Sequence, residues 1–272
     1  MMSIPQALFL GIVQGLTEFL PISSSGHLVL FQHYLGLTEP MVFFDVLLHA
    51  GTLAAVVIFF RKELYLILLS LIKPSSAGNF SSQRQILLAV ILGTIPTGII
   101  GFFLEKIKDF LFQGVFISAA MLVLTGILLW MGETLSPSQK KSKIGISDAL
   151  LIGLMQGLAI IPGISRSGAT ISFGLIRGLG RRLSFQYSFF LFIPAVLGAL
   201  IMESREIALQ PATGAFPYVI GPIVAFAAGL VALRVLKKIL QEKKLVAFSY
   251  YCWVLGGGVL FMEAVKIIIK VA

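Results

Sequence analysis

The chain has 272 residues, of which 57% are hydrophobic and only 12% are charged. Soluble domains carry about 25% charged and about 45–50% apolar residues, so this composition excludes an ordinary soluble domain. The net charge of +9 does not indicate a nucleic-acid partner, because Lys and Arg begin at Arg61 and lie mainly between apolar runs, as membrane topology signals do. The single cysteine, Cys252, excludes an internal disulfide and a multi-cysteine metal site.

Continuous apolar runs predict an all-α polytopic membrane protein, because a transmembrane barrel would show short alternating segments. Two shorter apolar runs, 4–20 and 147–161, each lead into a stretch rich in Ser and Gly. The first twenty residues lack a positively charged region and a cleavage site, so we expect them to belong to the mature protein. Six runs are long enough to cross a bilayer: 43–60, 86–104, 115–132, 185–202, 216–236 and 246–270.

The two shorter runs are related in sequence. GIVQGLTEFLPISSSGH (11–27) and GLMQGLAIIPGISRSGA (153–169) align without gaps at an offset of 142 residues and match at eight positions. The run 43–60 lands on 185–202 at the same offset. The sequence therefore predicts an internal duplication.

The duplication divides one integral membrane domain, 1–272, into repeat 1 at about 1–135 and repeat 2 at about 145–272. Each repeat holds a re-entrant helix–loop–helix followed by three transmembrane helices. Because three is odd, the second repeat is expected to have inverted topology, with the two re-entrant tips meeting near the midplane. With the N-terminus outside, fifteen Lys and Arg lie on the cytoplasmic side and five on the outer side, as the positive-inside rule requires.

The loops 21–27 and 162–168 are expected to form an anion site. Pro and Gly break each helix, Ser supplies hydroxyl groups, and each restarted helix directs free N–H groups into the gap. Arg166 adds a guanidinium suited to phosphate or diphosphate. The structural alternative is a helix cap beside a tight turn. The residues expected to bind substrate are Gln14, Ser23, Ser25, Gly26, Ser165, Ser167, Gly168 and Thr170.

Glu18 and Gln14 lie on one face of a helix because they are four residues apart, and His27 follows beyond the turn. Ionisable groups inside a membrane are costly unless they pair or serve function. In one interpretation Glu18 pairs with His27 or with an Arg and only stabilises the fold. In the other, Glu18 with Gln14 holds a divalent cation while His27 faces phosphorus. Repeat 2 has Ile160 and Ala169 at the positions of Glu18 and His27, so the reactive groups and the clamping Arg are expected in different loops.

Several other polar residues are interpreted structurally. Asp45 and His49, one helical turn apart, either line the cavity or form a buried hydrogen-bonded pair, and the pair is the preferred interpretation. Asp148 is interpreted as a helix N-cap, the arginines within 177–182 as a topology signal, and glycines 256–258 as a site of close helix contact.

QGLTEFLPISSSGH (14–27) and PGISRSGATIS (162–172) resemble the two signature regions of the undecaprenyl-diphosphate phosphatases associated with bacitracin resistance. The similarity in hydropathy and spacing extends over essentially the whole chain. The resemblance implies a bacterial plasma-membrane hydrolase that removes the terminal phosphate of a C55 isoprenoid diphosphate and recycles the lipid carrier for peptidoglycan synthesis. It also implies a Mg²⁺ or Ca²⁺ requirement and a site open to the outer face.

By the same resemblance, the metal-binding element falls on Gln14 and Glu18, the loop Ser and His on Ser24 and His27, and the essential Arg on Arg166. Whether His27 is a nucleophile or a general base stays open, as does the role of Ser24 in positioning or receiving the phosphoryl group. The expected partners are the polyprenyl diphosphate substrate and membrane lipids, without nucleic acid; a homodimer is left open. The rival function is a transporter or flippase of polyprenyl phosphate lipids.

Overall fold

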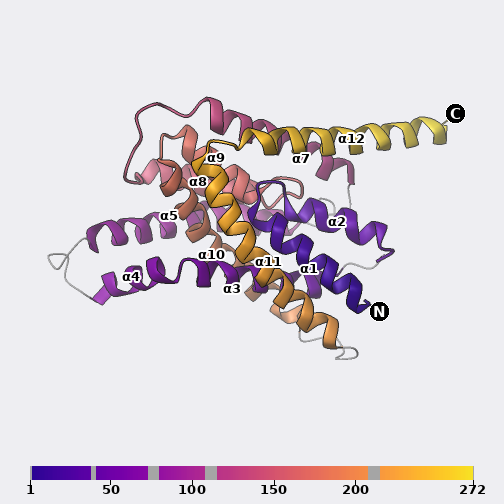
Figure 1. The fold of residues 1–272 in the computed structure, drawn as a ribbon, viewed down its shortest axis with the longest axis horizontal. Coiled ribbons are helices and arrows are strands. Elements are labelled where there is room, and N and C mark those ends of the chain that lie inside the picture. The colour runs from indigo at the N-terminus through magenta and orange to yellow at the C-terminus, as the bar shows by residue number, and fades with distance from the viewer. Residues whose placement is uncertain (1, 38–40, 73–79, 108–114, 208–214, 272) are drawn as a thin grey trace.

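The computed structural model describes residues 2–37, 41–72, 80–107, 115–207 and 215–271, and helices make up nearly all of this part of the chain. Figure 1 shows their arrangement, with α4 and the start of α5 projecting at one end and the last turns of α12 at the other. The helices are α1 (Ile4–Phe19), α2 (Ser24–Tyr34), α3 (Val42–Phe59), α4 (Arg61–Ile72), α5 (Phe80–Glu105), α7 (Val115–Thr134), α8 (Ile146–Leu158), α9 (Arg166–Ile176), α10 (Arg181–Ile207), α11 (Ala215–Gln241) and α12 (Val246–Val271).

Five of these helices, α5, α7, α10, α11 and α12, are long and apolar enough to cross a bilayer, and α3 with α4 makes a sixth candidate that bends by 74°. The prediction of an integral, polytopic α-helical membrane protein is thereby confirmed. The structure differs from expectation after Phe60. Within 61–85, which the hydropathy pattern leaves as a connection between spans, α4 and the first turn of α5 are helical.

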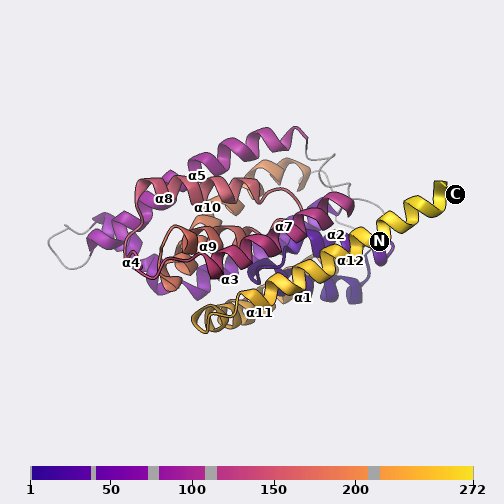
Figure 2. The ribbon, with the colours of Figure 1, turned by 90° about the horizontal axis from the view of Figure 1, so that it is seen from above.

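The two short N-terminal helices of the broken segments pack in related ways. Helix α1 lies along α11, and α8 lies along α5 (Figures 1 and 2). Glycine permits both contacts: a Cβ on Gly15 would lie 2.5 Å from the Ala225 carbonyl oxygen, and one on Gly153 would lie 2.1 Å from that of Gly93. Since a side chain would force the helices apart, these glycines fix how closely each broken segment approaches its neighbour.

Helices α7 and α12 run side by side, as both views show. A Cβ on Gly256 would lie 2.8 Å from the Ala119 carbonyl oxygen, whereas one on Gly257 or Gly258 would meet no atom of the described residues within 4 Å. The close contact expected of 256–258 is therefore confirmed for Gly256 and wrong for the other two, because they lie on other faces of α12.

The largest buried cluster is aromatic and joins α1, α3, α9, α10 and α11. Phe19 at the end of α1 makes edge-to-face contacts with Phe189 and Phe192 of α10, at 5.5 and 6.2 Å between ring centroids. Edge-to-face pairs add about 0.5–1.5 kcal/mol each beyond burial of their area. This packing holds the end of α1 against α10, where Arg166 also lies.

Asp148 is not the N-cap of α8. Gly145 occupies that position, and Asp148 lies three residues further on, where its Oδ2 accepts from the Gly145 N–H at 3.3 Å. The Asp148 carboxylate also pairs with Lys141 Nζ at 3.0 Å and Arg177 Nε at 2.8 Å. Arg181 pairs with Glu133. Two of the arginines interpreted as topology signals thus also tie the α9–α10 connection to the start of α8 and the end of α7.

Candidate active site

Two helix breaks define the site. Helix α1 ends at Phe19 and α2 begins at Ser24; α8 ends at Leu158 and α9 begins at Arg166. Each break contains a residue in the left-handed region, Ser23 with φ of 68° and Gly163 with φ of 94°. For a residue other than glycine this conformation is strained, and such strain clusters at functional sites.

The serines that follow the two breaks have the same arrangement. Ser23 Oγ accepts from the Gly26 N–H at 3.4 Å, and Ser165 Oγ accepts from the Gly168 N–H at 3.1 Å. The hydroxyls of Ser23 and Ser25, and those of Ser165 and Ser167, each lie 3.3 Å apart. These side chains therefore cap the restarted helices, and all except Ser25 are buried.

Thr170 lies one turn beyond the second break, buried within the protein. Its Oγ1 donates to the Arg166 carbonyl oxygen at 2.8 Å and lies 2.6 Å from Ser188 Oγ. The hydroxyl therefore joins α9 to α10 and faces the packed interior rather than the gap between the breaks.

Glu18 is the centre of the polar cluster. Its Oε1 accepts from Arg166 Nη2 at 2.9 Å, and its Oε2 accepts from Ser24 Oγ at 2.6 Å and from Gln14 Nε2 at 3.1 Å. The side chains of Glu18 and Arg166 are 6% and 13% exposed. The two breaks thus place a carboxylate from one and a guanidinium from the other in direct contact in a shielded environment.

Two buried polar atoms of this cluster have no hydrogen-bond partner among the described residues: Arg166 Nη1 and Gln14 Oε1. The Arg166 guanidinium lies 3.9 Å from the Phe192 ring centroid, which fixes its plane. Because buried polar groups are almost always hydrogen-bonded, unpaired ones require an explanation. The free N–H of Arg166 suits an anionic ligand, and the free amide oxygen of Gln14 beside the Glu18 carboxylate suits a cation. Together they suit an anion that brings a cation with it.

No hydrogen bond or ion pair joins the His27 side chain to Glu18, Arg166 or Gln14 in the described part of the chain. Its Nδ1 lies 2.8 Å from the Ser23 carbonyl oxygen, and its Nε2 lies 2.6 Å from the Tyr251 hydroxyl. The sequence pointed to neither contact, since Tyr251 belongs to an apolar span without a motif.

The imidazole beside Glu18 is that of His49, whose Nε2 lies 3.6 Å from Glu18 Oε2. Asp45 and His49 are hydrogen-bonded as predicted, but through the backbone, since His49 Nδ1 lies 2.7 Å from the Asp45 carbonyl oxygen. The pair is half-buried rather than buried, and Asp45 Oδ1 accepts from Gln32 Nε2 at 2.7 Å. The signal that could have identified His49 is an ionisable group inside an apolar span, which is a functional hypothesis by default.

The side chains around Glu18 offer few ligands for a divalent cation. No group of three or more His, Cys, Asp or Glu side chains able to hold a metal occurs in the described part of the chain. Mg²⁺, however, is usually bound by one or two carboxylates together with substrate phosphates and water. The Glu18 carboxylate with the unpaired amide oxygen of Gln14 fits such a shared site, and does not fit an all-protein cage.

Comparison with known proteins decides the family. The family model described as "Bacitracin resistance protein BacA" matches residues 7–258. The chain is 43% identical to an undecaprenyl-diphosphatase of Desulfosudis oleivorans over 272 residues, covering 94% of this chain and 97% of the relative. It is 42% identical to one of Carboxydothermus hydrogenoformans over 268 residues, covering 95% and 97%. This chain belongs to the BacA family.

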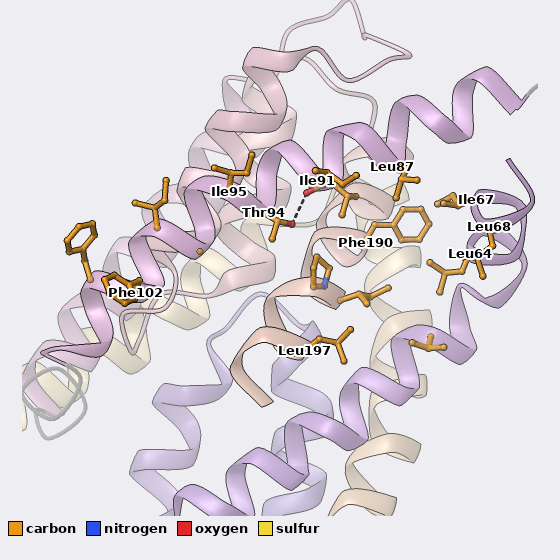
Figure 3. Close-up of a pocket in the computed structure, with 17 residues that line it drawn as sticks. Leu64, Ile67, Leu68, Leu87, Ile91, Thr94, Ile95, Phe102, Phe190 and Leu197 are labelled. Carbon is orange, nitrogen blue, oxygen red and sulfur yellow. Dashed lines mark hydrogen bonds between the residues drawn. The ribbon is translucent and has the colours of Figure 1, made fainter. Parts of the chain in front are cut away.

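This BacA-family protein has an apolar groove of about 1010 Å³ between α3–α4, α5 and α10. Figure 3 shows aliphatic and aromatic side chains along it, including Leu64, Ile95 and Phe190. Among the lining residues Thr94 alone has a polar side chain, and its hydroxyl donates to the Val90 carbonyl oxygen at 2.7 Å. The groove therefore offers apolar contact to a ligand.

The groove and the polar cluster share α10. Phe190 and Ile193 line the groove, while Phe189 and Phe192 lie against the Arg166 guanidinium. Along α5 the lining runs from Leu87 to Phe103, a rise of about 24 Å at about 1.5 Å per residue. The groove of the BacA-family protein is thus nearly as long as a hydrocarbon core of about 30 Å is thick.

Proposed function

We propose that this protein hydrolyses undecaprenyl diphosphate to undecaprenyl phosphate and inorganic phosphate, with the diphosphate bound between the two helix breaks. The observation that carries the proposal is the buried contact between Glu18 and Arg166, with an unpaired Arg166 Nη1 and an unpaired Gln14 Oε1 beside it. The enzyme name shared by the relatives at about 40% identity supports the reaction.

Arg166 is the clamp for the diphosphate in this proposal. Its Nη1 donates to a phosphate oxygen while Nη2 stays on Glu18, so the guanidinium plane and its position are set before substrate arrives. The N-termini of α2 and α9 supply N–H groups and a positive dipole end to the same headgroup. Phosphoryl transfer depends mainly on such positioning and charge neutralisation.

Glu18 and Gln14 would hold a divalent cation, Mg²⁺ or Ca²⁺, together with the diphosphate. When bound, the cation supplies charge neutralisation on the oxygen of the leaving lipid phosphate. The Glu18 carboxylate is held in place by Ser24 and Arg166, which orients its second oxygen towards Gln14. The one carboxylate and one amide at this site support a cation shared with substrate.

His27 and Ser24 are the candidates for the chemical step, with two versions. His27 either attacks phosphorus or activates water, and Ser24 either positions or receives the phosphoryl group. Ser24 Oγ donates to Glu18 Oε2 at 2.6 Å, so the carboxylate can take the hydroxyl proton if Ser24 receives the phosphoryl group. His27 reaches the headgroup through the nitrogen now bonded to Tyr251.

The apolar groove is proposed to bind the polyprenyl tail. A C55 tail is purely hydrocarbon, and the groove offers purely apolar contact over a length close to the thickness of a hydrocarbon core. Phe190 and Phe192 are two residues apart and therefore lie on roughly opposite faces of α10. Tail and headgroup would thus lie on either side of one helix.

The protein is further proposed to be two inverted repeats in the bacterial plasma membrane, with its site open to the outer face. The matching glycine contacts of α1 with α11 and of α8 with α5 support the duplication. The excess of Lys and Arg in the segments assigned to the cytoplasm supports the orientation. The product, undecaprenyl phosphate, is the lipid carrier that is used again for peptidoglycan synthesis. We propose that its continued supply confers bacitracin resistance.

Hydrolysis and lipid transport are separated by one assay. Purified protein in detergent has no second compartment, so release of inorganic phosphate from C55 diphosphate requires hydrolysis. We expect release in Mg²⁺ or Ca²⁺, its loss in EDTA, and its loss in Glu18→Ala. A protein that moves the lipid between leaflets of vesicles and releases no phosphate in detergent would contradict the proposed function.

A further inference from the structure

The two hydrogen bonds of His27 identify its tautomer. A carbonyl oxygen cannot donate, so the 2.8 Å contact to Ser23 requires that Nδ1 carries the proton. In the neutral ring Nε2 is then the acceptor, and the Tyr251 hydroxyl, at 2.6 Å, donates to it. Nε2 is therefore the nitrogen with the lone pair, and Tyr251 is the group that holds it.

The two sides of the ring differ in how firmly they are held. The Ser23 carbonyl also accepts from the His27 backbone N–H, at 3.3 Å, and its direction follows from the left-handed φ of Ser23. The Nδ1 side is thus bonded to backbone within its own loop. On the other side, Tyr251 comes from α12, 224 residues away, and its ring stacks on that of His27 with centroids 5.8 Å apart and planes at 10°.

Tyr251 is 43% exposed, whereas His27 is 4% exposed. A hydroxyl that bonds a buried imidazole from a partly open position can be replaced there by a phosphate oxygen or a water molecule. A phenol also donates to a neutral imidazole and accepts from an imidazolium, so the same contact serves both protonation states. These properties suit a group that guides a reacting nitrogen.

We propose that Tyr251 is a positioning residue for His27. It aligns Nε2 towards the headgroup, stabilises the tautomer with the proton on Nδ1, and releases Nε2 when substrate enters. The inference rests on the proposed function and deepens it, because it names Nε2 as the reacting atom of His27, whether that atom takes a proton from water or bonds phosphorus.

The test compares Tyr251→Phe with Tyr250→Phe in the purified full-length protein. The first change removes the hydroxyl and keeps the stacked ring; the second removes a hydroxyl from the adjacent tyrosine, whose ring packs on Trp253. We expect Tyr251→Phe to lower kcat for C55 diphosphate about tenfold, because the ring orientation and tautomer of His27 are no longer set before substrate enters, with KM unchanged. Thermal stability is expected to fall slightly, because the buried Nε2 loses its hydrogen-bond donor. Tyr250→Phe is expected to match wild type.

A spectroscopic readout tests the contact itself. In protein labelled with ¹⁵N-histidine, the His27 signals, assigned by their loss in His27→Gln, are expected to show one neutral tautomer in wild type and a shifted Nε2 signal in Tyr251→Phe. The double variant His27→Gln/Tyr251→Phe is expected to be no slower than His27→Gln alone, because residues acting as a unit are not additive.

The results distinguish a failure of the role proposed for Tyr251 from a failure of the proposed function. An active wild type with a fully active Tyr251→Phe, or with His27 nitrogen signals unchanged by that substitution, overturns the role of Tyr251. A wild type that releases no phosphate overturns the proposed function instead, and the nitrogen signals then still report whether the His27–Tyr251 bond exists.

Discussion

Arg166 Nη2 lies 2.9 Å from Glu18 Oε1, although 148 residues separate the two in sequence. Each side chain flanks one of two related helix breaks, Glu18 in the last turn of α1 and Arg166 at the start of α9, and is nearly buried. Breaking a buried ion pair by removing one partner costs about 3–5 kcal/mol, so this contact must stabilise the fold as well as serve the site. The unpaired Nη1 of Arg166 distinguishes it from an ion pair whose role is only structural.

Arg166→Lys is expected to lower kcat/KM for C55 diphosphate by about 10²–10³-fold, the usual loss when one donor to a reacting group is removed. The lysine keeps the positive charge beside Glu18 but cannot bond the carboxylate and a phosphate oxygen in one plane. Arg166→Ala and Glu18→Ala are expected to lose still more. Phosphate release, normalised to folded protein by size-exclusion chromatography, measures the effect; a Lys variant with wild-type rates would contradict the clamp.

Gln14→Ala is expected to raise the Mg²⁺ concentration needed for half-maximal activity about tenfold, because it removes an unpaired oxygen beside Glu18. Gln14→Glu, which adds a second carboxylate, is expected to lower it. The matched control is Gln156→Ala at the related position of repeat 2, where the Gln156 amide donates to the Leu191 carbonyl at 3.1 Å. That change is expected to affect stability and leave the Mg²⁺ dependence as in wild type; equal Mg²⁺ shifts in both would refute a cation at Gln14.

Asp45→Ala and His49→Ala are expected to separate stability from turnover. Asp45 bonds Gln32, so its loss is expected to cost about 1 kcal/mol of stability and to leave turnover per folded molecule near wild type. His49 lies 3.6 Å from Glu18 and is 34% exposed, so its loss is expected to lower turnover about tenfold with a smaller change in melting temperature. Thermal melting and phosphate release on the same samples test both expectations. A loss of turnover in Asp45→Ala together with a loss of stability alone in His49→Ala would contradict these assignments.

Gly98→Phe is expected to raise KM for C55 diphosphate about tenfold relative to a C15 diphosphate, since it places a ring in the groove. A Cβ at Gly98 meets no atom within 4 Å in the described chain, so the ring enters open space. Gly258→Phe, at an equally open position outside the groove, is the control. If both variants retain the wild-type ratio of KM values, the tail does not lie in this groove.

Gly153→Ala is expected to destabilise the protein by about 1–3 kcal/mol, because its Cβ would lie 2.1 Å from the Gly93 carbonyl oxygen and push α8 from α5. Gly257→Ala, where the added methyl meets open space, is expected to leave stability unchanged or slightly raised. Melting in detergent compares the two. A Gly153→Ala variant as stable as Gly257→Ala would show that the helices can separate without cost.

Much of this arrangement could be predicted from the sequence. Related breaks at 21–27 and 162–168 in an apolar chain indicate two loops buried together, because irregular backbone at membrane depth must face protein or a wet cavity. The contact of Glu18 with Arg166 follows from that placement. Five of the six predicted spans coincide with helices long and apolar enough to cross a bilayer, whereas the run 43–60 does so only together with α4.

Other features depend on packing that no local pattern encodes. Hydropathy locates an apolar run but not its direction, so the 74° bend between α3 and α4 was not predictable. Asp45 and His49 lie on one face of α3, but the packing of α3 against α1 places the His49 ring beside Glu18 rather than beside the Asp45 carboxylate. Tyr251 meets His27 only because α12 returns beside the first break, and a tyrosine in an apolar span carries no sequence signal of its own.

The only cysteine, Cys252, is fully buried, with its Sγ 3.8 Å from the Pro21 carbonyl oxygen behind the first break. Membrane-impermeant thiol reagents will therefore not reach it in the folded protein. New cysteines placed one at a time in the segments between helices can be labelled from either side of intact cells against a silent background, which reads the orientation of the chain directly without first removing a native thiol.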